Sequence, residues 1–210
     1  MAVCPDAAAS EGLEDPRIKR SKASLRAALI ELMEERGFDS LTVNDICVKA
    51  GLNRGTFYNH YRDKETLLRS FEDEIFEELE VFQERMKSVR VKDIMRHRLS
   101  KKPFPFLVEM FAYLCEHGDF LHAVIGPGGD VRFGPRLRQA VCDDLIMSVL
   151  HERYRENPTP FVDYYVAYFA SAYLGVIGRW IETGMKESPE EMAAIATRLL
   201  FIRPGESITL

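Results

Sequence analysis

Apolar residues recur at helical spacing along almost the whole chain, and this constrains the fold more than any other feature of the sequence. No stretch alternates convincingly between apolar and polar residues, as a half-buried strand would. We therefore expect an all-α fold. The expected helices cover about residues 21–36, 42–50, 54–61, 63–86, 106–117, 135–154, 160–185 and 188–201, and a further segment at 91–99 precedes a break at two prolines.

Residues at helix ends support these assignments. Thr42-Val43-Asn44-Asp45 predicts a capping box, and Gly51 ends the same short helix. Ser188-Pro189-Glu190-Glu191 combines a cap, a first-turn proline and a capping-box glutamate. Asp63 is expected to cap the long helix that follows, with the glutamates of 72–84 on its wet face. The stretch Gly126-Pro127-Gly128-Gly129 is expected to be a flexible loop.

Composition and length favour a soluble globular protein. The chain has 210 residues, of which 46% are hydrophobic and 29% charged. Its longest uncharged apolar run, residues 164–178, is shorter than the ~20 residues of a membrane span, so it predicts a deeply buried helix. The first sixteen residues show no signal peptide and are expected to form a loose tail. The four cysteines are far apart, which indicates reduced thiols in the cytoplasm.

Charge is distributed unevenly along the chain. Residues 17–64 contain ten Lys or Arg and six Asp or Glu, although the whole chain has a formal net charge of −5. A basic block on an acidic body indicates an anionic partner, although a solvated helix face gives the same count.

Within this block, two short helices joined by a glycine turn predict a helix-turn-helix packed on a longer first helix. Its apolar positions would join the second and third helices, and they are Val43, Ile46, Ala50, Leu52, Phe57 and Tyr61. The outward positions of the third helix are Arg54, Gly55, Thr56, Tyr58, Asn59 and His60. Such a mixture of hydrogen-bonding side chains and a small residue is typical of a surface that reads a DNA groove.

The chemistry of these side chains suggests a division of roles. Arg54 can donate two hydrogen bonds to guanine, Asn59 can pair with adenine, and Thr56 can touch a thymine methyl group or a phosphate. Gly55 would allow close approach to DNA, whereas Tyr58 and His60 suit phosphate oxygens. The amides that follow Thr42 and Asp63 form two helix N-termini for phosphates, with Lys64 beside the second.

Residues 41–67 resemble the DNA-binding segment of TetR-type transcriptional regulators, and the resemblance extends over about 17–68. It is carried by Gly51, Gly55-Thr56-Phe57-Tyr58, Tyr61 and Asp63-Lys64-Glu65. The resemblance implies a helix-turn-helix head, residues 17–63, on a larger helical body, residues 64–210, that dimerises and binds an effector.

By this resemblance the protein is a homodimer that binds a palindromic double-stranded operator, and most simply a repressor released by a small molecule. The implied phosphate contacts are Thr42, Thr56, Tyr58, His60 and Lys64, and the implied base contacts are Arg54, Gly55 and Asn59. The last two helices would form the four-helix dimer interface, with half-sites about one helical turn (~34 Å) or a multiple apart.

The body gives weaker signals. An effector pocket is expected to use Met110, Phe111, Tyr165, Tyr168 and Phe169, although core packing explains any one of them. No metal-ligand spacing, cofactor motif or catalytic triad motif is found in the sequence, so we expect no metal, no cofactor and no enzyme activity. The competing hypotheses are an all-α carrier or enzyme that uses the head as a scaffold, and a structural module that binds another protein.

Overall fold

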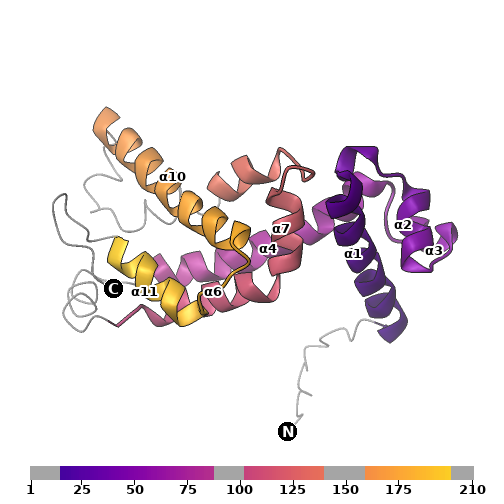
Figure 1. The fold of residues 1–210 in the computed structure, drawn as a ribbon, viewed down its shortest axis with the longest axis horizontal. Coiled ribbons are helices and arrows are strands. Elements are labelled where there is room, and N and C mark those ends of the chain that lie inside the picture. Colours follow the sequence, from indigo (N-terminus) through magenta and orange to yellow (C-terminus); the bar gives the residue numbers. More distant parts are fainter. Residues whose placement is uncertain (1–14, 88–101, 140–158, 200–210) are drawn as a thin grey trace, which may run out of the picture.

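The computed structural model describes residues 15–87, 102–139 and 159–199, and every regular element in these ranges is a helix, which confirms the all-α fold. Figure 1 shows an elongated molecule with α1 (Pro16–Arg36), α2 (Val43–Ala50) and α3 (Arg54–Tyr58) at one end. These three helices, with the 3₁₀ helix η1 (Phe38–Ser40), are called the head. Helix α4 (Lys64–Lys87) leaves the head and runs into the rest of the protein, called the body.

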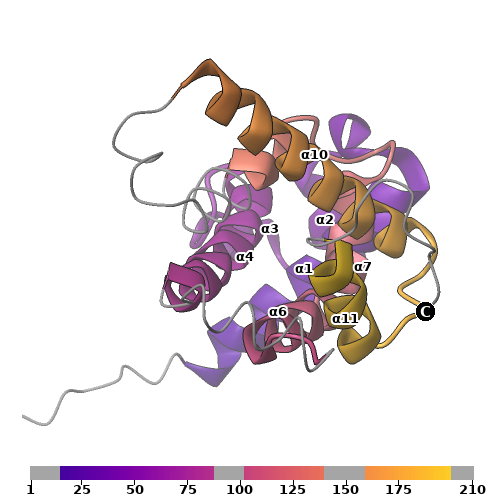
Figure 2. The ribbon, with the colours of Figure 1, turned by 90° about the vertical axis from the view of Figure 1, so that its left-hand side faces the viewer.

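The body contains α6 (Pro105–Glu116), α7 (Gly118–Ile125), α10 (Pro160–Glu182) and α11 (Pro189–Leu199). Figure 2, which views the molecule from the end of the body, shows α4, α6, α11 and α10 arranged around its centre. Helix α11 packs on α6, and α10 packs on α7. A further helix covers residues 133–139, two residues earlier than predicted. The predicted segments at 91–99 and 140–154 lie outside the described residues.

Two helix boundaries differ from the prediction for local reasons. Helix α1 begins at Pro16, about five residues early, because the Asp15 carboxylate accepts a 2.8 Å hydrogen bond from the Arg17 backbone amide and proline fits the first turn. Helix α7 was not predicted at all. It has only eight residues and follows α6 after the single non-helical residue His117. The sequence therefore contains no separate signal for a second helix between α6 and the glycine-rich loop.

The predicted caps are confirmed. In α2 the Asp45 amide donates to Thr42 Oγ1 over 3.2 Å, and the Asp45 carboxylate accepts from the Thr42 amide over 3.0 Å. In α11 the corresponding distances between Ser188 and Glu191 are 3.2 and 2.8 Å. At the start of α4 the Asp63 carboxylate accepts a 2.7 Å bond from the Thr66 amide. Hydrogen bonds from Thr66 and Arg62 lower the pKa of Asp63 to about 2.

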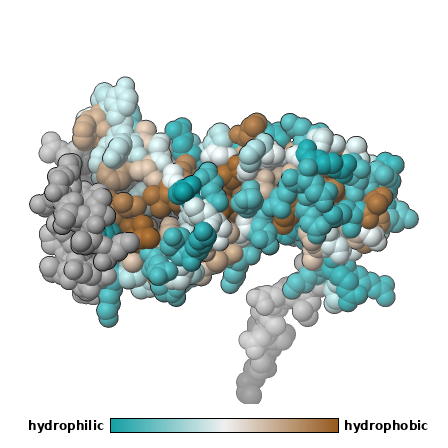
Figure 3. Space-filling model, in the orientation of Figure 1, coloured by the Kyte–Doolittle hydropathy of each residue, from teal (hydrophilic) through white to brown (hydrophobic). Residues whose placement is uncertain are grey.

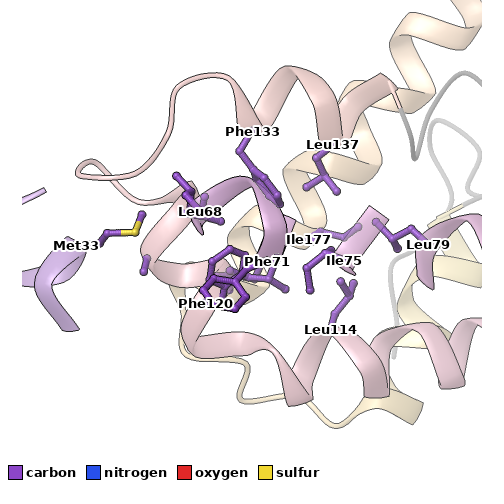
Figure 4. Packing of buried hydrophobic residues seen from close by; sticks show 14 of the residues in the cluster. Met33, Leu68, Phe71, Ile75, Leu79, Leu114, Phe120, Phe133, Leu137 and Ile177 are labelled. Carbon is purple, nitrogen blue, oxygen red and sulfur yellow. The ribbon is translucent and has the colours of Figure 1, made fainter. Parts of the chain in front are cut away.

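One apolar core runs through head and body. Figure 4 shows side chains from α1, α4, α6, α7, residues 133–139 and α10 packed together, among them Met33, Phe71, Phe120 and Phe133. The predicted inward residues of α4, Leu67, Phe71, Ile75, Leu79 and Phe82, are all buried. The side chain of Met86, also predicted inward, lies outside the described residues. Helix α4 therefore packs against helices of both the head and the body.

The loop of residues 126–129 was expected to be flexible, but it packs against the head. The Gly128 carbonyl accepts a 2.7 Å hydrogen bond from the Phe38 amide. A Cβ atom on Gly128 would lie 2.9 Å from both the Gly37 Cα and the Met33 carbonyl oxygen. Glycine thus permits a backbone-to-backbone contact that joins body to head.

Helix α10 is buried on one face only, contrary to the prediction that it is buried on every side. Val162, Ala170 and Ile177 face the core, whereas Tyr164 and Tyr168 are 77% and 70% exposed. By length and composition α10 could cross a membrane, a property shared with core helices of soluble proteins, and 22% of its apolar window is buried in the single chain. A second apolar face on this helix is left without a partner within the described residues.

Candidate nucleic-acid interface

The turn between α2 and α3 is set by a left-handed glycine. Gly51 has φ 65° and ψ 30°, a conformation that side chains disfavour. Its amide donates to the Val48 carbonyl and that of Leu52 to the Cys47 carbonyl, which closes the end of α2. Asn53 then caps α3 by accepting a 2.8 Å bond from the Gly55 amide. Two backbone hydrogen bonds and one cap bond to the Asn53 side chain therefore direct the chain from one helix into the next.

The inner side of α3 is anchored in the core. Phe57 and Ile46 are fully buried, and Tyr61 is nearly so. The Phe57 ring lies 5.8 Å from the Tyr61 ring and 5.5 Å, edge-on, from the Tyr58 ring. Val43, Ala50 and Leu52 pack against the same cluster, as the sequence predicts.

The outer side of α3 collects polar side chains on one exposed surface. Arg54, Gly55, Tyr58, Asn59 and His60 are exposed, and Thr56 is half-buried. A Cβ on Gly55 would meet only the Asn53 side chain, at an ordinary 3.5 Å, so the protein's own packing does not require glycine there. We call this surface, formed by residues 54–60, the α3 face.

Arg54 and Tyr58 interact on the α3 face. The Arg54 Nη2 donates to the Tyr58 hydroxyl over 3.4 Å, and the guanidinium lies 5.9 Å from the ring centre. This hydrogen bond raises the pKa of Arg54, which stays a cation. Residues one helical turn apart thus restrict each other's orientation.

Helix α3 ends at Tyr58, three residues before the predicted end. Asn59 is its C-cap, and the amides of His60 and Tyr61 both donate to the Phe57 carbonyl, over 3.0 and 2.9 Å. Because one carbonyl accepts both bonds, the chain tightens into a turn that ends the helix. Asn59 and His60 therefore lie at the end of the α3 face rather than within the helix.

Two predicted phosphate contacts already have partners inside the head. The Thr42 hydroxyl accepts from the Asp45 amide and donates to its carboxylate over 2.7 Å. The Lys64 ammonium donates to the carbonyl oxygens of Phe38 and Asp39, each over 3.0 Å, and lies 4.8 Å from the Phe38 ring centre. Because an ammonium has three N–H groups, one donor of Lys64 is left over.

The five predicted pocket residues lie on two helices, α6 and α10. Met110 and Phe111 are buried in α6, and the Phe111 ring lies 5.4 Å, edge-on, from Trp180. On α10, Tyr165 and Tyr168 are exposed and flank the half-buried Phe169. Their assignment to an effector pocket stays a prediction.

A different set of residues forms a cavity that the sequence did not indicate. It has a volume of about 300 Å³ and is lined by Glu65, Arg69, Glu72, Asp130, Arg132 and Arg136. Glu72, predicted on the wet face of α4, is only 3% exposed, because Arg136 and the segment around it cover this part of the helix. Helical periodicity places Glu72 one position after the inward Phe71, and no local signal distinguishes it from the exposed glutamates.

Comparisons with known proteins bear on both parts of the chain. Residues 25–71 match the family described as "Bacterial regulatory proteins, tetR family", and residues 101–201 match the one described as "Transcriptional regulator C-terminal region". The "Uncharacterized HTH-type transcriptional regulator YxbF" of Bacillus subtilis (strain 168) is 35% identical over 57 residues. This alignment spans 27% of the chain and only 15% of that relative.

Solved structures resemble most of the chain in fold. A TetR transcriptional regulator from Streptococcus agalactiae 2603V matches with a TM-score of 0.55 and 21% identity, over 89% of this chain and 96% of that one. The fatty acid degradation regulator FadR of Bacillus halodurans matches with a TM-score of 0.59 and 16% identity, over 90% and 96% of the two chains. The dihydroxyacetone kinase operon activator DhaS matches with a TM-score of 0.55 and 20% identity, over 86% of this chain and 93% of that one.

The amino-terminal match covers the helix-turn-helix, and the carboxy-terminal match covers most of the body that follows it. The α3 face, anchored from within and polar outside, has the form that a DNA-reading head requires. The chain therefore belongs to the TetR family of transcriptional regulators, which bind DNA and are not enzymes.

Proposed function

We propose that the protein is a homodimeric regulator that binds a palindromic operator and represses transcription until a small-molecule effector releases it. The observation that carries the DNA-binding part is the α3 face, on which polar side chains project from a helix anchored by the buried Phe57. The side of the head seen in Figure 3 is mainly hydrophilic, which suits a surface that contacts phosphates. Regulators of this family are soluble and cytoplasmic in general, and we assign this protein to the cytoplasm.

On this proposal α3 enters the major groove of one half-site. Arg54 and Asn59 read base edges, and Gly55 lets the helix backbone approach the DNA. Arg54 is restricted by Tyr58 before binding, so less side-chain freedom is lost when it meets a guanine. The surrounding phosphate contacts are assigned to Thr42, Thr56, Tyr58, His60 and Lys64.

For Thr42 and Lys64 the contacts inside the head limit what each can add. The Thr42 side chain is used in the helix cap, so its contribution to binding is to fix the start of α2, where the amides of Val43 and Asn44 would meet a phosphate. Lys64 has one ammonium donor beyond its two carbonyl acceptors, and it would place that donor on a phosphate.

The dimer part of the proposal is supported by the unpartnered face of α10. Phe161, Tyr164 and Tyr168 expose 73, 77 and 70% of their surfaces in the single chain. Burying aromatic surface of this size is strongly favourable. A second copy related by a twofold axis would cover this face and give the symmetry of a palindromic site. The head at 17–63 and the body at 64–210 are the corresponding functional units.

A DNase footprint on the DNA upstream of the protein's own gene, at two salt concentrations, tests the DNA-binding part. We expect a protected palindrome, with log affinity falling by about 0.9 per phosphate contact for each unit of log salt. The double variant Arg54→Ala/Tyr58→Ala should lose protection but keep its circular dichroism spectrum, because both side chains are exposed. The control variant Arg85→Ala, which changes the body, should protect the same site.

If the wild type binds its upstream DNA no better than random DNA, a search of the whole genome follows. Absence of any preferred site there contradicts the proposal and leaves the carrier hypothesis. The operator as template in an in vitro transcription assay decides the sign of regulation, since a repressor lowers and an activator raises transcript yield.

The dimer is tested by light scattering of the double variant Tyr164→Glu/Tyr168→Glu. Burying two carboxylates is costly, so we expect a monomer with weak operator binding. The control Val131→Glu places one such carboxylate on a residue that is 88% exposed but outside α10, and it should remain a dimer. A dimer in both variants contradicts the assignment of this face.

A further inference from the structure

The cavity at the end of the body nearest the head takes no part in the functions discussed above. One wall belongs to the first turns of α4, which leave the head, and the other to a body segment that follows the loop docked on the head. Its volume of about 300 Å³ suits a small molecule. Its lining is entirely charged, with three carboxylates and three guanidinium groups on Glu65, Arg69, Glu72, Asp130, Arg132 and Arg136.

Glu72, which lines this cavity, has an unsatisfied buried oxygen. Its Oε2 accepts a 2.5 Å hydrogen bond from Arg136 Nη1, but its buried Oε1 has no hydrogen-bond partner in the described chain. The residue is 3% exposed, and this burial raises the pKa of the carboxyl group to about 7. A buried acceptor without a donor is destabilising, so a donor supplied by a ligand would gain a strong, charge-assisted bond.

Arg69 provides the complementary group. It lies three residues before Glu72, on the same side of α4, and the described chain gives it neither a hydrogen bond nor an ion pair. The other two guanidinium groups are engaged. Arg132 is bound to Asp130 over 2.9 Å, and Arg136 is bound to Glu72 and, over 2.6 Å, to Asp73. One cation and one acceptor are thus available within one helical turn.

These two groups define the chemistry of the occupant. A simple anion would pair with Arg69 but leave Glu72 Oε1 without a donor. A simple cation would pair with Glu72 Oε1 but leave Arg69 without an anion. The described residues contain no group of His, Cys, Asp or Glu side chains suited to a metal ion. We propose that this cavity binds a small hydrophilic zwitterion of the amino-acid type, with its ammonium on Glu72 Oε1 and its carboxylate on Arg69.

The position of the cavity gives such a ligand a regulatory consequence, which rests on the function proposed above. The body wall is continuous with Gly128, whose carbonyl accepts the Phe38 amide of the head. A molecule between the two walls contacts at once the first turns of α4, which lead out of the head, and the segment that follows the docked loop, so it changes the freedom of the head relative to the body. It therefore alters operator affinity.

Calorimetric titration of the protein without DNA, at a pH above 7 where Glu72 is ionised, tests the site directly. The probes are glycine, 3-aminopropanoate, 4-aminobutanoate and 5-aminopentanoate, in which the separation of ammonium and carboxylate increases. Butanoate and butylamine carry one charge each and serve as matched controls. We expect at least one amino acid to bind, and both controls to bind about tenfold to a hundredfold more weakly.

Two variants assign the binding to this cavity. Arg69→Gln removes an exposed charge that no described residue uses. Glu72→Gln has a single carbonyl oxygen, which stays on Arg136, so its amide nitrogen, a donor, replaces the acceptor that the ligand needs. Each should weaken binding about tenfold or more, whereas Arg138→Gln, an exposed arginine outside the cavity, should leave it unchanged.

Failure to bind any of the four amino acids, equal binding of butanoate, or unchanged binding in both cavity variants overturns the assignment. Operator affinity is measured separately, so the two proposals fail separately. Amino-acid binding without any DNA binding refutes the regulator and leaves the cavity site. Binding of both that leaves operator affinity unchanged refutes the regulatory consequence alone.

Discussion

A methyl group added at Gly128 tests the contact between head and body. In Gly128→Ala the new Cβ would lie 2.9 Å from the Gly37 Cα and 2.9 Å from the Met33 carbonyl oxygen. Both are backbone atoms, so no side chain can rotate away and the loop must move. Overpacking of this kind costs about 1–3 kcal/mol. The movement also breaks the 2.7 Å bond from the Phe38 amide, worth about 1 kcal/mol, which brings the total to about 2–4 kcal/mol.

The chain contains a matched control for this change. Gly134 lies in the helix at 133–139, and a Cβ there would meet nothing within 4 Å. Gly134→Ala should therefore stabilise the protein by about 0.4–1 kcal/mol, because alanine restricts the unfolded chain. The same chemical substitution, six residues apart, is expected to change the free energy of unfolding in opposite directions.

Urea unfolding followed by circular dichroism measures both variants, at one fixed protein concentration because association contributes to stability. We also expect the unfolding transition of Gly128→Ala to lose cooperativity, since the loop joins two parts of the molecule. A free energy of unfolding for Gly128→Ala within about 0.5 kcal/mol of the wild type would refute the reasoning. It would mean that the loop moves without cost and does not hold the head.

Three further changes test other parts of the structure. Thr42→Ala removes the α2 cap and should cost about 1 kcal/mol in a thermal or urea melt, whereas Thr42→Ser keeps the hydroxyl and should cost less. Phe57→Ala empties the fully buried centre of the helix-turn-helix and should cost about 3–5 kcal/mol; a smaller loss would show that the head collapses around the space. The third concerns Glu72, whose folded-state pKa of about 7 lies above its ordinary 4.5, so the folded protein holds a proton that the unfolded chain releases. Glu72 therefore contributes about 3 kcal/mol to the free energy of unfolding below pH 4.5, and this contribution is lost as the pH rises through 7. Glu72→Gln should remove this part of the pH dependence, and identical profiles for variant and wild type would contradict the assigned pKa.

The sequence by itself determined the features that depend on neighbouring residues. The caps at Thr42 and Ser188 and the turn at Gly51 involve partners three or four positions away, so residue type and spacing suffice to predict them. The polar α3 face was predicted for the same reason, because a short helix whose aromatic residues Phe57 and Tyr61 point inward has a defined outer side. The exposure of these residues was predictable from the sequence. The end of α3 was not, because it depends on the turn at Phe57–Tyr61, which the apolar periodicity does not show.

Contacts between distant segments were decided by the tertiary structure alone. Glu72 is buried because Arg136, sixty-four residues later, folds over it, and Lys64 is occupied by the carbonyls of Phe38 and Asp39. The apolar period of α10 indicates that its faces are hydrophobic but not which of them packs within the chain. Periodicity shows which residues share a face of one helix. Burial and pairing depend on which other helix lies against that face.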